Sequence, residues 1–297
     1  MGKQTSTSET SQVIGALLRA HLLDARGCVS KLRGPRASVH DVRVALRRLR
    51  TTLTAYRRYL GAWALPTERA LGELAQKVDF LRDSEVQLSW LLEHRNELKS
   101  KQRAEAETLI KILRANKVTS QRYLRLTWIP RFERVSARLA GHVESIGMIR
   151  RQPSFVKAFR KVIKRRISRF RTNARKVAGR RKARDLHSMR IKGKQIRYLI
   201  EPFVQHSANL RRTEKVLETL QASLGDLHDI ELLRSRCVEP SDKARNVQQF
   251  RRLSALLKDE ERNLVSKAFD TLSRGRLSKT LKEAQSSLRS LQLQVLV

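Results

Sequence analysis

The chain has 297 residues, with 64 Lys and Arg against 28 Asp and Glu, which gives a formal charge of +36. A soluble protein this far from neutrality repels itself, so we expect a polyanion partner that supplies negative charge. Hydrophobic residues make up 40% of the chain, which is enough for a buried core and excludes disorder throughout.

Composition also argues against several other classes of protein. Cys28 and Cys237 lie far apart and form no Cys-x-x-Cys pair, which argues against a disulfide framework or a zinc site. No apolar run approaches the roughly 18 residues of a membrane span, and residues 1–12 lack the apolar segment of a signal peptide. We therefore expect a cytoplasmic protein that does not associate with a membrane and needs no metal or cofactor.

Apolar residues recur at helical spacing through the first half of the chain, after a Ser/Thr-rich stretch at residues 1–10 that predicts a disordered tail. This spacing predicts helices over about residues 13–33, 38–60, 66–98 and 101–140. Ser38 is the expected N-cap of the second helix. Pro130 is expected to start, kink or break a helix within the fourth.

The helical pattern weakens between Gly141 and Pro153 and then restarts. The second series of predicted helices covers about residues 154–177, 185–206, 208–236 and 241–291. Pro202 is expected to bend or end the second of these, and Gly275 to interrupt the last. Because strand signals are nearly missing, we predict an all-α fold of two four-helix bundles, 11–147 and 153–293, related by pseudo-twofold symmetry through internal duplication.

Two similar basic segments support the duplication. They align at an offset of 147 residues and pair His40 with His187, Arg43 with Arg190, Arg47 with Lys194, and Arg50 with Arg197. On a helix these four positions fall within an arc of roughly 80°. Each segment therefore predicts a helix with one cationic stripe, and we call the two sets of four residues the first stripe and the second stripe.

A second pair of segments aligns at an offset of 146 residues and places Asp83 opposite Asp229. Each acid lies one helix after a stripe. We expect these two carboxylates to form structural salt bridges with the stripe arginines, and a catalytic role is the alternative.

These motifs resemble the CHAD domain, the conserved histidine α-helical domain. The resemblance is carried by Val39-His40-Asp41-Val42-Arg43, by Leu186-His187 with Arg190, Lys194 and Arg197, and by Leu224-Gly225-Asp226-Leu227-His228-Asp229. It implies a single domain of two bundles with a central basic groove or pore, binding of inorganic polyphosphate without catalysis, and an association with polyphosphate or other storage granules. The chain resembles a stand-alone member of the family.

The second copy departs from the first at several positions. Ser188 replaces Asp41, Lys192 stands where the family favours a small residue, and Gln195 stands where the first copy has Arg48. His228 occupies a position where Asn is common in the family. Lys194 and Arg197 nevertheless preserve the second stripe.

The stripes suit a linear phosphate chain because arginine presents forked, permanently charged donors to phosphate oxygens and lysine a point charge. The predicted polyphosphate-binding residues are both stripes, Arg57 and Arg58, and Lys157, Arg160 and Lys164 on a strongly basic helix. A solvated basic face is the alternative for that helix. His40 and His187 either bind the anion when protonated or form hydrogen bonds at the start of their helices.

Three other functions remain open. Non-specific nucleic-acid binding suits the charge, although aromatic residues make up only 5% of the chain and stacking platforms are therefore scarce. A metal-dependent phosphohydrolase is suggested by His40-Asp41 and His228-Asp229, but the duplication explains both pairs more simply. A structural granule-coat protein would not depend on the stripes.

Overall fold

All regular elements in the part of the chain that the structure describes are helical. The computed structural model describes residues 9–34, 38–148, 153–180, 183–238 and 249–273, together with residues 281 and 283. The first half contains α1 (Glu9–Lys31), α2 (Val39–Tyr56), η1 (Arg57–Tyr59), α3 (Ala64–His94), α4 (Ser100–Tyr123), η2 (Leu124–Trp128), α5 (Ile129–Glu144) and η3 (Ser145–Met148). The second half contains α6 (Phe155–Arg180), α7 (Ala183–Ile200), η4 (Glu201–His206), α8 (Ala208–Val238) and α10 (Arg251–Ser273).

Helix boundaries follow the local signals in the sequence. The Ser38 hydroxyl accepts a hydrogen bond from the Asp41 backbone N–H at 3.2 Å and caps α2. Pro130 lies in the first turn of α5, after a π-helical turn, so the predicted fourth helix is divided there. Pro202 follows the end of α7 and lies in the 3-10 turn η4. The prediction of an interruption near Gly275 lies outside the described residues.

The start of the chain differs in part from the expectation. Residues 1–8 of the predicted tail lie outside the described residues, whereas α1 already begins at Glu9. Thr10 at its first turn is buried, and its hydroxyl donates a hydrogen bond to the Pro153 carbonyl oxygen. The beginning of the first bundle is therefore fixed against the beginning of the second.

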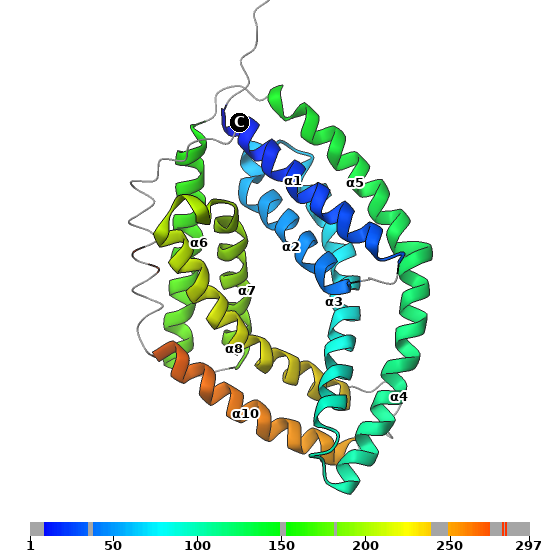
Figure 1. Ribbon diagram of the computed structural model, residues 1–297. Coiled ribbons are helices and arrows are strands. Elements are labelled where there is room, and N and C mark those ends of the chain that lie inside the picture. The colour runs from blue at the N-terminus through cyan, green and yellow to red at the C-terminus, as the bar shows by residue number, and fades with distance from the viewer. Residues whose placement is uncertain are drawn as a thin grey trace, which may run out of the picture.

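The two halves meet through helices that hold corresponding places in their order. Contacts between the halves join α1 to α6, α2 to α7, α3 to α8 and α4 to α10. In Figure 1, α4 and α5 run along one side of the molecule, α6 runs along the other, and α10 crosses below α8. A pseudo-twofold axis requires this kind of pairing, while the duplication itself stays a prediction.

The apolar core is shared between the halves. One cluster of buried residues extends from Ile14 in α1 through both halves to Leu227 in α8. A second cluster joins the distal parts of α3 and α4, including Leu91 and Leu109, to Leu233 of α8 and to α10. Because each cluster takes side chains from both halves, burial of apolar surface stabilises the two halves as one unit.

Two further findings bear on the sequence-based expectations. Both cysteines are free thiols, with Cys237 buried and Cys28 half-buried. Among the described helices, none combines the length and the apolar character that crossing a bilayer would need.

Candidate functional site

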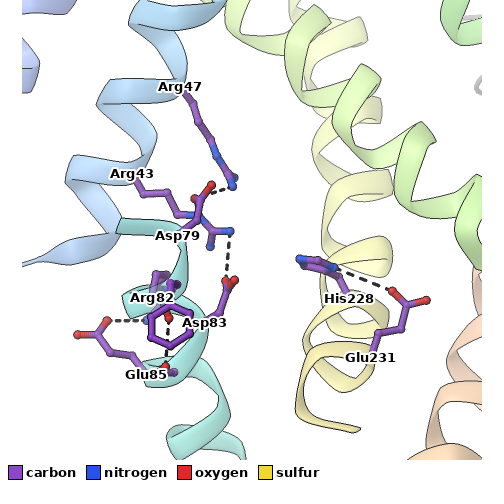
Figure 2. Close-up of polar contacts among 10 residues, drawn as sticks. Arg43, Arg47, Asp79, Arg82, Asp83, Glu85, His228 and Glu231 are labelled. Carbon is purple, nitrogen blue, oxygen red and sulfur yellow. Dashed lines mark hydrogen bonds and ion pairs between the residues drawn. The ribbon is translucent and has the colours of Figure 1, made fainter. Parts of the chain in front are cut away.

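The first stripe lies on α2, whose apolar positions are turned into the core. Val42, Leu46 and Leu49 are fully buried, and this fixes the rotation of the helix so that Arg43 and Arg47 point toward α3. The guanidinium of Arg43 pairs with Asp79 and lies 3.3 Å from Asp83, measured from Nη2 to Oδ1. Figure 2 shows these groups on the side that faces α8.

Asp79 is a partner that the sequence-based prediction did not include. Its Oδ1 also accepts a hydrogen bond from Arg47 Nη2 at 2.9 Å, so one carboxylate holds two stripe arginines. Asp79 lies one helical turn before Asp83 on the same face of α3, and this spacing of four residues was the available signal. The structure places Asp83 beside Arg43, where the predicted salt bridge requires it.

The second stripe differs from the first in how its cations are neutralised. Arg190 is only 7% exposed, and its Nε has no hydrogen-bond partner among the described residues. The negative charge of Asp229 raises the pKa of Arg190, but no ion pair within 4.0 Å joins the two in the described part of the chain. Among the described residues, Asp229 thus attracts Arg190 only at longer range, as Asp83 does, and no carboxylate lies within 4.0 Å of this guanidinium.

The two stripes converge in space. Burial, together with the charges of Arg190, Arg47, Arg43 and Arg197, lowers the pKa of Lys194 to about 6. Burial also lowers the pKa of Arg190, with contributions from Arg47 and Arg43 of the other half. Arg43, Arg47, Arg190 and Lys194 therefore form one group of cations between α2 and α7, which we call the central cluster.

The ends of the stripes are neutralised by nearby acids. Arg50 Nη2 lies 2.8 Å from Glu68 Oε1, and Arg197 Nη1 lies 3.3 Å from Glu218 Oε1. These acids belong to α3 and α8, which follow the stripe helices in their respective halves. The cations that lower the pKa of Lys194 and of Arg190 belong to the stripes. The other predicted binding residues are not among them, namely Arg57, Arg58, Lys157, Arg160 and Lys164.

Those other predicted residues occupy peripheral positions. Arg57 and Arg58 are exposed in η1, beyond the end of α2. Lys157 and Lys164 are exposed on α6, and Arg160 is half-buried on the same helix. His40 and His187, in contrast, lie close enough to the central cluster for its charges to lower their pKa values.

Burial and nearby cations favour the neutral form of the histidines of the site. Burial lowers the pKa of His40 and of His187, and nearby cations lower both further. His228 is affected most, because burial and the charge of Arg190 lower its pKa to about 3. His187 and His228 have ring centroids 4.9 Å apart. The protonated imidazoles considered from the sequence would therefore require a bound anion.

Among the residues that the structure describes, one group of side chains has the composition of a metal site, although no metal was expected. His187, His228 and Glu231 offer ligand atoms within 4.8 Å of one another, and His228 Nδ1 lies 4.0 Å from Glu231 Oε2 (Figure 2). The same cations that lower the His228 pKa would repel a divalent ion. Burial raises the pKa of the Glu231 carboxyl to about 7, so it too is a weak ligand near neutral pH.

Comparison with protein families supports the resemblance seen in the motifs. Residues 16–238 match the CHAD domain, a segment that includes both stripes. The chain belongs to the CHAD domain family. A comparison with curated protein sequences gives no match.

Solved structures of CHAD-like fold cover nearly the whole chain. The crystal structure of the CHAD domain from the plant Ricinus communis matches with a TM-score of 0.67 and 19% identity, and the match covers 97% of this chain and 94% of that one. PptA from Streptomyces chartreusis matches with a TM-score of 0.64 and 14% identity, over 93% of this chain and 100% of that one. At these identities the likenesses show a common fold.

Proposed function

We propose that this CHAD protein binds inorganic polyphosphate at the central cluster and performs no catalysis there. The observation that supports it most directly is the state of Arg190, a buried guanidinium whose Nε has no partner among the described residues. Burying an incompletely paired charge is costly, and the neighbouring cations increase the cost. A bound polyanion would supply the missing acceptors.

The chemistry of the cluster suits a linear phosphate chain. Polyphosphate has about one negative charge per phosphate and no bases, so it is recognised by repeated donors along a path. The two stripes supply such a path from α2 to α7 because their central members lie within one field. The CHAD family membership agrees with this ligand, since polyphosphate binding is what the resemblance implies.

Calorimetric titration with polyphosphates of defined length tests the proposal. The informative variant combines Arg190→Ala with Lys194→Ala, because within the described part of the chain neither side chain has an ion-pair partner within 4.0 Å whose loss would disturb the fold. Arg43→Glu is less suitable, since it would place a third carboxylate beside Asp79 and Asp83. We expect the affinity to fall about 100-fold or more, because each charge-assisted hydrogen bond contributes about 1.5–3 kcal/mol.

A control variant removes the same charge elsewhere. Lys111 and Arg114 are exposed on α4, and replacing both by Ala removes the same residue types and lowers the formal net charge by the same amount. If the control loses as much affinity as the cluster variant, net charge alone binds the anion and the proposed site is wrong.

Nucleic acid is the competing polyanion, since the net charge of +36 suits it equally well. Binding to DNA by itself therefore decides nothing. We expect long-chain polyphosphate to displace duplex DNA at equal phosphate concentration and salt. Displacement of polyphosphate by DNA under these conditions would contradict the proposal.

The phosphohydrolase alternative needs a metal that the cations around His228 oppose. Incubating the protein with polyphosphate and divalent metals tests it, and we expect no phosphate release. Release that is lost in Asp229→Ala would instead establish an enzyme. We further propose a cytoplasmic protein that reaches polyphosphate granules through the cluster, so that the Arg190 and Lys194 double variant should fail to localise to them.

A further inference from the structure

A second basic pocket lies between α6 and α7. It has a volume of about 460 Å³, and its lining includes Arg166, Arg169 and Lys192. Asp185 is the one carboxylate that lines it among the described residues. The pocket therefore has an excess of positive charge without the acids that neutralise Arg43 and Arg47 in the first stripe.

Two of the cations of this pocket are held by neutral groups. Arg166 Nη1 donates to Gln195 Oε1 at 2.5 Å, and Lys192 Nζ donates to Ser188 Oγ at 2.7 Å. An amide and a hydroxyl orient these cations but cannot offset their charge. Burial, together with the charges of Arg169 and Arg165, lowers the pKa of Arg166. Like charges thus crowd the pocket in the free protein, and an anion would relieve the repulsion.

The same region of the first half is built differently. Gln195 corresponds to Arg48, whose guanidinium contacts the carboxylates of Asp24 and Glu201. Ser188 corresponds to Asp41, and Lys192 corresponds to Ala45 at the offset of 147 residues. The departures at Ser188, Lys192 and Gln195 lie three or four residues apart on one face of α7, and all three line the pocket. Together they replace one carboxylate and one guanidinium by neutral groups and add a lysine, so this side of the cavity gains one positive charge and loses its only acid among the three positions.

His187 joins the pocket to the central cluster. Its ring lines the pocket and lies 4.9 Å, between centroids, from the ring of His228. The charges of Arg190 and Lys194 also act on His187. His187 therefore borders the pocket and also lies in the electrostatic field of the central cluster.

We propose that the pocket between α6 and α7 is a second phosphate-binding site, which takes a further segment of the polyphosphate chain held at the central cluster. This inference rests on the proposed function. Arg166, Arg169 and Lys192 would donate to phosphate oxygens, with Gln195 and Ser188 keeping two of them in position. The second half then binds more of the chain than the first, although both stripes have four residues at the same spacing.

Titration with a long polyphosphate chain and with tripolyphosphate tests the site. The pocket variant combines Arg169→Ala with Lys192→Ala, and the matched control is Lys111→Ala with Arg114→Ala. We expect the pocket variant to bind the long chain at least about tenfold more weakly than the control does, since two charge-assisted contacts are lost. Tripolyphosphate, which the cluster alone can hold, should bind the two variants equally.

Acetylation of lysines, measured by mass spectrometry, reports on the pocket directly. We expect the long chain to protect Lys192 in the wild type while the exposed Lys111 stays reactive. Equal losses for the pocket variant and the control, with Lys192 unprotected, would overturn the second site. Protection by orthophosphate at the same phosphate concentration would instead indicate a separate site for inorganic phosphate, which also contradicts a shared chain.

The outcomes separate the two proposals. If the Arg190 and Lys194 double variant binds the long chain as tightly as the wild type does, the central cluster is not the site and the proposed function fails. If that variant loses binding while the pocket variant behaves like the control, only the second site is wrong.

Discussion

Replacing Lys194 by Met should stabilise the free protein and weaken polyphosphate binding. Lys194 lies among Arg190, Arg47, Arg43 and Arg197, and burial and these charges lower its pKa from 10.5 to about 6. The unfolded chain holds this proton at neutral pH, whereas the folded protein releases it. Folding therefore includes the free-energy cost of removing a proton from Lys194. A neutral side chain of similar length removes that cost.

The size of the effect follows from the pKa difference. At pH 7.5 the ordinary pKa lies about 3 units above the pH, and at about 1.4 kcal/mol per unit the cost is on the order of 4 kcal/mol. The folded-state pKa lies below the unfolded value, so the penalty is fully present below about pH 6 and disappears as the pH rises toward 10.5. The gain in Lys194→Met should shrink accordingly as the pH is raised.

Urea unfolding of the wild type and of Lys194→Met, at several values between about pH 6.5 and 9, measures this change. Lys111→Met is the control, because Lys111 is exposed on α4 and its replacement should change the unfolding free energy by less than about 0.5 kcal/mol. A stability gain that does not vary with pH would show that Lys194 keeps its proton in the free protein. The argument for an electrostatically strained cluster would then be wrong.

Three further predictions follow from the same structure. Polyphosphate affinity should rise by up to about tenfold when the pH falls from about 8 to 7, because binding returns roughly one proton to Lys194. Calorimetry in buffers of different ionisation enthalpy counts that proton, and an affinity that does not change with pH would contradict the prediction. Trp128→Phe should cost about 1–3 kcal/mol in thermal or urea unfolding, because the buried indole Nε1 donates to the Leu74 carbonyl oxygen at 2.9 Å, and no loss would mean that the carbonyl finds another partner. Arg48→Ala should cost about 1–2 kcal/mol of stability, because it breaks the ion pair with Glu201 that links the two halves. Polyphosphate binding should change little, and a loss of binding free energy as large as the loss of stability would place Arg48 in the binding site.

Much of the fold could be predicted because its signals are local. The recurrence of Val42, Leu46, Leu49 and Leu53 at helical spacing predicts α2, and all four are fully buried. Ser38 begins that helix by capping it, as a short polar side chain at this position does. Such signals act over three or four residues, so they need no knowledge of the partners that a helix meets.

The site could be predicted only in part. The stripes were found because their members repeat along a helix, and their convergence followed from the family resemblance. The role of Asp79 was missed, since the sequence did not show which of the acids on α3 would face Arg43. The salt bridge expected between Asp229 and a stripe arginine is not formed with Arg190 among the described residues, where only a longer-range attraction remains, because the rotation of α7 against α8 depends on the packing of both.

The sequence by itself determined the helices, the order of the two halves and the existence of two cationic stripes, because these depend on residue type and on helical periodicity. Only the tertiary structure decided which cations are neutralised. It pairs Arg43 with Asp79 and Asp83, leaves the Nε of Arg190 without a partner among the described residues, and places Lys192 in the pocket between α6 and α7. Burial and charge pairing are set by contacts between helices that are distant in the sequence, and these contacts turn similar stripes into sites of different strength.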